Sequence, residues 1–94
     1  MNAQDKKTAE DFFKAVLSLK DEDECADFFS DMCTTKEILS IAQRYTVAKM
    51  LKNRRVYSDI VKETGASTAT VSRVKRMMSD GTGTVSKLLQ RTGD

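Results

Sequence analysis

The side chains that could carry chemistry in this 94-residue chain are acids, two cysteines and a basic stretch rich in hydroxyl groups. Histidine is absent, which removes the commonest general base and every Ser-His or Cys-His arrangement. The acidic residues 21–24 form one local run, which is typical of a helix start rather than of catalytic carboxylates. No glycine-rich phosphate-binding loop occurs. We therefore expect no catalytic activity and no cofactor.

The two cysteines, Cys25 and Cys33, stand eight residues apart in what the sequence pattern indicates is one helical region. Eight helical residues span about 12 Å, which is beyond the reach of a disulfide. A zinc site would need a second pair of Cys or His ligands, and the chain has none. We expect small, buried, reduced side chains, no metal site and a cytoplasmic protein.

Charge is spread unevenly along the chain. Residues 1–43 carry five lysines against ten acids, net −5, whereas residues 44–94 carry eleven Lys or Arg against four acids, net +7. The second half is therefore the part expected to face an anion. No apolar run approaches the ~20 residues of a membrane span, and the N-terminus lacks the apolar core of a secretory signal. We expect no membrane partner.

Every convincing segment has helical periodicity, so the predicted fold class is all-α. A first helix is predicted over residues 5–20, and DEDE at 21–24 starts a second. Thr34 and Glu37 form a capping box that opens a third helix, which runs to about residue 53. The apolar stripe expected on the third helix comprises Ile38, Ile41, Ala42, Tyr45, Ala48 and Leu51.

Two short helices joined by a glycine-containing turn, at about residues 57–78, match the helix-turn-helix pattern. Ser58 is expected to cap the first helix, and Gly65 to end it in a left-handed conformation. Ser67 or Thr68 then caps the second helix. The residues expected to pack inward are Ile60, Val61, Ala66, Val71 and Val74. A final short helix is expected over residues 84–91.

The same packing turns a small and basic face of the second short helix outward. Small residues near its N-terminus permit close approach to base edges in the major groove, and the basic residues that follow suit phosphates. The residues expected to contact DNA are Thr68, Ala69, Thr70, Ser72, Arg73, Lys75 and Arg76. The alternative is an amphipathic surface helix whose basic face is merely solvated.

The run GASTATVSR, which follows IVKET, closely resembles the helix-turn-helix of the Trp repressor family. The resemblance extends upstream through TTKE and QRYTVAKML and covers about residues 30–80. It implies one domain over residues 1–94, with six helices that intertwine with a second copy. That homodimer would present two recognition helices to a pseudo-palindromic operator in double-stranded DNA. The aromatic residues Phe12, Phe13, Phe28 and Phe29 are expected in its shared core.

The resemblance also implies which side chains touch DNA. Base contacts in the family come from the start of the recognition helix, which here means Thr68, Ala69, Thr70 and Ser72. Lys62 on the preceding helix would contact a phosphate, and Ser67 completes the candidate set.

A possible effector site follows from the same resemblance. Arg44 and Arg73 stand where the family sandwiches tryptophan between two arginines, and Thr34 matches a third position. The family has a glycine directly after the second arginine and a serine three residues further on, where this chain has Val74 and Met77. The valine methyl groups would occupy the space of the ring, and methionine cannot replace the hydrogen bonds of serine. We expect a pocket filled by side chains and an effector other than L-tryptophan, if any.

Two other functions remain open. A helical protein-interaction module could dock a partner through the acidic first half and the apolar helices. The helix-turn-helix also resembles that of origin-recognition modules, which the lack of an appended ATPase disfavours. A DNA reader needs Thr68, Thr70 and Arg73 exposed, with a twin set about 34 Å away. The predicted function is a sequence-specific transcriptional regulator, a repressor.

Overall fold

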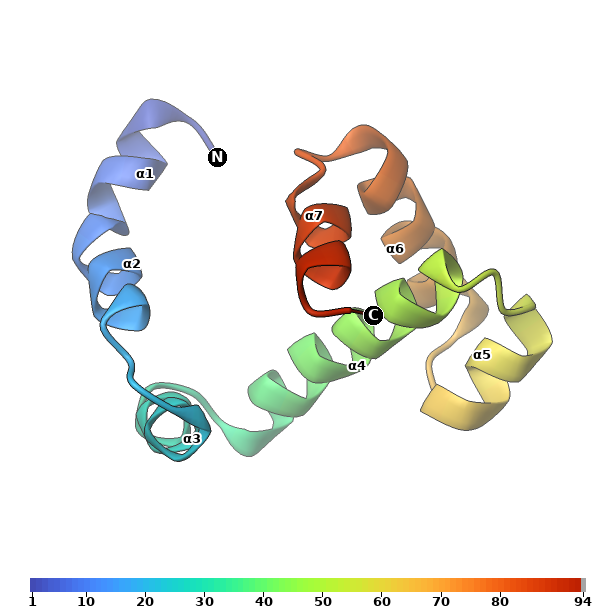
Figure 1. The fold of residues 1–94 in the computed structure, drawn as a ribbon, viewed down its shortest axis with the longest axis horizontal. Helices are drawn as coiled ribbons and strands as arrows, with labels where there is room; N and C mark the ends of the chain where they lie inside the picture. The colour runs from blue at the N-terminus through green and yellow to red at the C-terminus, as the bar shows by residue number, and fades with distance from the viewer. Residues whose placement is uncertain (94) are drawn as a thin grey trace. The chain divides into compact units, whose positions relative to one another are not determined.

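The computed structural model describes residues 1–93, and every regular element in that range is an α-helix, as predicted (Figure 1). The chain divides into two compact units, one formed by Met1–Ile38 and one that begins at Leu39. The helices are α1 (Ala3–Thr8), α2 (Glu10–Leu17), α3 (Glu22–Met32), α4 (Thr35–Lys52), α5 (Tyr57–Thr64), α6 (Thr68–Asp80) and α7 (Thr84–Arg91).

The single helix predicted over residues 5–20 is two segments, so residues 1–93 hold seven helices rather than six. The break falls at Ala9, whose ψ angle is near 0° while its N–H still donates to the Asp5 carbonyl. The second segment ends at Leu17 because the Ser18 hydroxyl donates to the Ala15 carbonyl, 2.7 Å away, and competes with the helical pattern.

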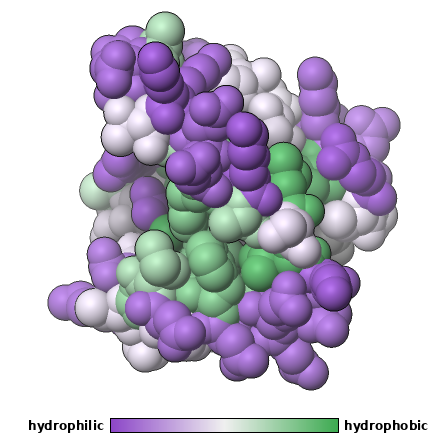
Figure 2. Space-filling model, turned by 90° about the vertical axis from the view of Figure 1, so that its left-hand side faces the viewer, coloured by the Kyte–Doolittle hydropathy of each residue, from purple (hydrophilic) through white to green (hydrophobic). Residues whose placement is uncertain are grey.

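The first unit gathers its aromatic rings without burying them. The ring centroids of Phe12 and Phe28 lie 5.9 Å apart in a stacked arrangement, and those of Phe28 and Phe29 lie 5.3 Å apart edge to face. None of the residues in Met1–Ile38 is buried, and Leu17 is 85% exposed. Figure 2 shows apolar side chains that reach the molecular surface, bordered by hydrophilic ones. Helices α1–α3 therefore have no core of their own.

Local side-chain caps set the helix boundaries at the end of the first unit. The Asp21 carboxylate accepts the Glu24 N–H at 2.8 Å and caps α3. The predicted capping box of α4 is present, since the Glu37 N–H donates to the Thr34 hydroxyl and the Thr34 N–H donates to the Glu37 carboxylate at 2.8 Å. The hydrogen bond from the Thr34 N–H and, to a smaller extent, the Thr34 hydroxyl favour the ionised carboxylate and lower the pKa of Glu37.

Replacing Thr34 by valine is expected to raise the Glu37 pKa only part of the way towards its ordinary value, because the smaller hydroxyl contribution is lost while the larger one, from the N–H of residue 34, is kept. A carboxyl whose pKa is lowered by folding adds stability above its unfolded pKa, and that stability is lost as the pH falls through the folded value. An NMR titration of the Glu37 side chain in both proteins measures the difference. Equal pKa values in the two proteins would contradict this role for Thr34.

The core of the second unit lies where α5, α6 and α7 gather around the C-terminal half of α4 (Figure 1). Its buried residues are Val47, Ala48, Met50, Ile60, Ala66, Val71, Val74 and Leu89. The apolar face predicted for α4 was only partly correct. Ala48 is buried, but Ile41 is 55% exposed, while Val47 and Met50 are buried instead. The predicted one-sided stripe differs because three helices enclose this end of α4.

The helix-turn-helix is formed by α5 and α6, and its turn has the predicted chemistry. Gly65 ends α5 with a φ angle of 74°, in the left-handed region. Ser67 caps α6 by accepting the Thr70 N–H at 3.1 Å. The predicted Ser58 cap is wrong, because the cap position is the apolar Val56, two residues earlier, and α5 begins at Tyr57.

A second left-handed residue joins α4 to α5. Arg54 has a φ angle of 58°, and its N–H donates to the Leu51 carbonyl. The next N–H, that of Arg55, reaches back to the Met50 carbonyl at 3.0 Å. These two bonds are the pair that closes a Schellman motif, which usually carries glycine at the left-handed position.

Within residues 1–93, no helix combines the length and the apolar character that crossing a bilayer requires.

Candidate nucleic-acid interface

The N-terminal half of α6 presents small side chains over a buried anchor. Val71 and Val74 are 0% and 2% exposed and fix the rotation of the helix about its axis. That rotation leaves the small residues Thr68, Ala69 and Ser72 exposed. The basic residues that follow, Arg73, Lys75 and Arg76, are exposed too. The helix can therefore bring small polar groups close to a partner and place cations behind them.

Thr70 departs from the expected outward orientation, because it is half-buried. Its hydroxyl oxygen accepts a hydrogen bond from the Ser67 hydroxyl at 3.1 Å, and its N–H donates to the same Ser67 oxygen. The Ser67 hydroxyl is therefore already engaged, both as donor and as acceptor, in capping α6. Of these two candidates, Thr70 keeps a hydroxyl proton that can be donated.

The turn before α6 is held by a compact set of hydrogen bonds. The Thr64 hydroxyl donates to the Ile60 carbonyl at 2.6 Å and accepts the Ala66 N–H at 3.1 Å. The Gln43 amide of α4 donates to the Thr64 carbonyl at 3.0 Å. The turn is therefore tied both to its own helix and to α4, which fixes the start of the exposed α6 face.

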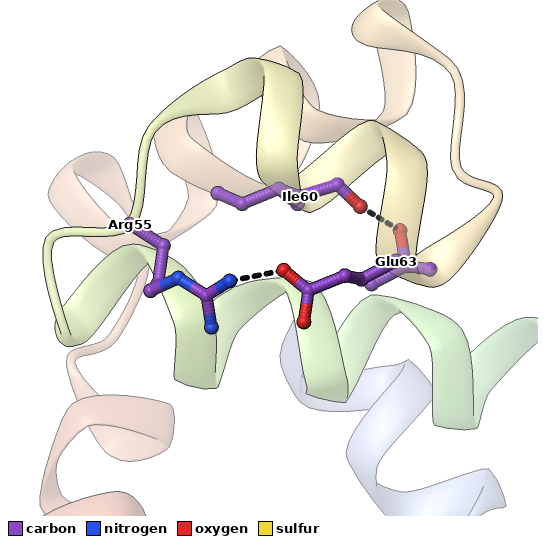
Figure 3. A network of polar contacts seen from close by, with 4 residues as sticks. Arg55, Ile60 and Glu63 are labelled. Carbon is purple, nitrogen blue, oxygen red and sulfur yellow. Dashed lines mark hydrogen bonds and ion pairs between the residues drawn. The ribbon is translucent and has the colours of Figure 1, made fainter.

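The first helix of the pair contributes charges of two kinds. Lys62 is exposed, as expected of a phosphate contact. Arg55, just before α5, instead forms an ion pair with Glu63 near the end of α5, and Figure 3 shows the two side chains pointing toward each other. The Lys75 ammonium of α6 lies 5.6 Å from the centroid of the Tyr57 ring, a cation–π distance that links the start of α5 to α6.

The two arginines of the candidate effector site line the same cavity. Its volume is about 530 Å³, and its walls are Ile41, Arg44, Tyr45, Ala48, Arg73, Val74, Met77 and Val85. The expectation that side chains fill the pocket was wrong. Val74 is nearly buried in the core, and with Met77 it forms part of the wall. Thr34 belongs to the first unit, where its hydroxyl accepts the Glu37 N–H.

Two residues of this region escaped the sequence analysis. Tyr57 carries a signal that could have been used, because an aromatic residue near a predicted basic helix is a common partner for a cation. Arg54 carries none, because only the backbone angle distinguishes it from other surface arginines.

Comparison with known proteins places this geometry in a family. The family whose description is "Trp repressor protein" matches residues 7–93. The uncharacterized Bacillus subtilis (strain 168) protein YerC is 49% identical over 85 residues, which cover 90% of this chain and 82% of YerC. A crystal structure of a TrpR-like protein from Eubacterium eligens ATCC 27750 is 52% identical, with a TM-score of 0.90, and the match covers 93% of this chain and 90% of that one.

A second crystal structure, from Staphylococcus aureus, is 44% identical, with a TM-score of 0.90 and coverage of 93% and 87%. The residues that the family matches, 7–93, include all of α2 to α7, with the exposed α6 face and the residues that line the cavity. The chain belongs to the Trp repressor family.

Proposed function

We propose that this protein is a sequence-specific DNA-binding transcriptional regulator, a repressor that acts in the cytoplasm. The observation that carries the proposal is the exposed α6 face, where Thr68, Ala69 and Ser72 precede Arg73, Lys75 and Arg76. Hydroxyl and methyl groups can read base edges in the major groove, and the cations can neutralise phosphates. Membership of a repressor family supports the same function.

The proposed working unit is a homodimer in which each chain acts as a single domain. Support comes from the first unit, where no residue of Met1–Ile38 is buried although four phenylalanine rings cluster there. A second copy would cover this apolar surface and place two recognition helices about one DNA turn apart. The operator would then be an inverted repeat read from both half-sites.

Selection of bound duplexes from a random DNA pool, without added ligand and near physiological salt, tests the proposal. The expected result is enrichment of an inverted repeat whose half-sites lie one helical turn apart. No enrichment without ligand, nor with a mixture of amino acids, would favour the alternative of a protein-interaction module. The exposed Leu17 and Met32 of the first unit are the feature that favours that alternative.

L-Tryptophan is not the effector in this proposal. The cavity between Arg44 and Arg73 is open, but Val74 and Met77 form its walls where the family has glycine and serine. Calorimetric titration with L-tryptophan is expected to show no binding tighter than about 1 mM. A micromolar dissociation constant would contradict this, and would make tryptophan-dependent DNA selection the next measurement.

A further inference from the structure

The loop between α4 and α5 contains an arginine in a backbone conformation that favours glycine. Arg54 is the only non-glycine residue among 1–93 with a positive φ angle, at 58°. Its N–H and that of Arg55 close the Schellman motif described above, so the geometry is built into the end of α4. A side chain held in this region often has a functional reason.

The Arg54 side chain has no structural partner that would explain its presence. It is exposed, and its guanidinium makes no hydrogen bond or ion pair with any residue in the described range 1–93. The adjacent Arg55 differs, because it is held by Glu63 (Figure 3). The two consecutive arginines therefore differ: Arg55 is held in an ion pair with Glu63, whereas the Arg54 guanidinium is available to bind an anion.

Arg54 lies in the loop between α4 and α5, three residues before the point where α5 contacts α6. The Lys75 ammonium lies 5.6 Å from the ring centroid of Tyr57, so the start of α5 is beside the basic stretch of α6. Arg54 precedes Tyr57 by three residues, and their Cα atoms can therefore lie no more than about 11 Å apart. We call Arg54, Tyr57 and Lys75 the basic ridge, because Arg54 lies near Tyr57 along the chain and Tyr57 contacts Lys75 of α6.

We propose that the basic ridge binds the sugar-phosphate backbone of duplex DNA beside the bases that α6 reads, with Arg54 as an additional phosphate contact. A guanidinium offers several N–H donors in a fork that matches phosphate oxygens, and a tyrosine hydroxyl can donate to the same group. This role would explain why arginine stands at a position that suits glycine. The inference rests on the proposed function.

The test uses the full chain, with Arg54→Gly and Arg54→Lys, on the duplex that the wild type selects. Glycine relieves the backbone and removes the cation, so the melting temperature is expected to rise while affinity falls about tenfold at 100 mM salt. The slope of log K against log salt is expected to shrink by about one for each arginine lost. Lysine keeps both the backbone conformation and the charge, and its affinity should stay within about threefold of the wild type.

Arg91→Gln is the matched control, because it removes one exposed cation from the end of α7. Its effect on the salt slope should be less than half that of Arg54→Gly. If the wild type binds no duplex, the proposed function and this inference both fail. If the wild type binds but Arg54→Gly leaves affinity and slope unchanged, or if Arg91→Gln weakens binding equally, only the inference is overturned.

Discussion

Replacing Ala69 by glutamate is expected to weaken duplex binding severely without unfolding the protein. Ala69 is exposed in the first turn of α6, where a carboxylate interacts favourably with the positive end of the helix dipole. At a DNA surface the same carboxylate would come close to the negatively charged duplex and would repel it. We expect a loss of affinity of at least about 100-fold, measured by fluorescence anisotropy on the selected duplex.

Ser79→Glu is the control for this substitution, because it adds the same charge to the same helix. Ser79 is exposed and lies about 15 Å from Ala69 along the α6 axis. Its affinity should remain within about fivefold of the wild type, given the screening of separated exposed charges. Should the Ala69 variant bind as well as the Ser79 variant, the N-terminal half of α6 does not enter the groove.

The largest expected loss of stability comes from Ile60→Ala. Ile60 is fully buried at the centre of the helix-turn-helix, in a core that has eight buried residues within the described range. Removing its side chain takes away apolar contacts and leaves a cavity between α5, α6 and α4, at a cost of about 3 kcal/mol. Urea unfolding followed by circular dichroism gives the free energy of unfolding, and a small core has little reserve against such a loss.

Val56→Ala provides the comparison, because Val56 is also aliphatic and stands just before α5 but is 59% exposed. Its free energy of unfolding should change by no more than about 0.5 kcal/mol. A loss below about 1 kcal/mol for Ile60→Ala would mean that the core of the second unit can collapse around the missing side chain.

The features that could be predicted from the sequence are those decided by a few neighbouring residues. The Thr34–Glu37 box, the Ser67 cap and the left-handed Gly65 all form within four residues, so residue type and spacing are sufficient. The inward positions of the helix-turn-helix were predicted for the same reason. A short helix with one apolar side has few ways to pack, and Val71 and Val74 are buried as expected.

The features that the sequence did not predict depend on contacts or backbone angles without a local signal. Ala9 interrupts the first helix although alanine is a strong helix former. Val56 precedes α5 without any side-chain cap, so Ser58 looked like the better start. Ile41 belongs to the predicted stripe of α4 yet is 55% exposed, because periodicity identifies an apolar face but not what covers it.

The candidate site shows the same division. The exposure of Thr68, Ala69 and Ser72 followed from the burial of their neighbours, whereas Thr70 is half-buried and lines a hollow with Gln43 and Arg44 of α4. The free space between Arg44 and Arg73 could not be predicted from the sizes of Val74 and Met77. It depends on the direction in which the Val74 side chain packs.

The absence of buried residues in Met1–Ile38 has a consequence for how long the chain survives in a cell. Amide hydrogens in α1–α3 can exchange with solvent through local opening, whereas those near Ile60 and Val71 must await the opening of an enclosed core. Proteases cleave segments that open easily, so α1–α3 would be the sites of cleavage in a chain that is not assembled with a second copy. Assembly would close that route, and degradation would then remove single chains selectively. The fraction of chains that survive as assembled regulator would therefore rise with the total concentration of the protein.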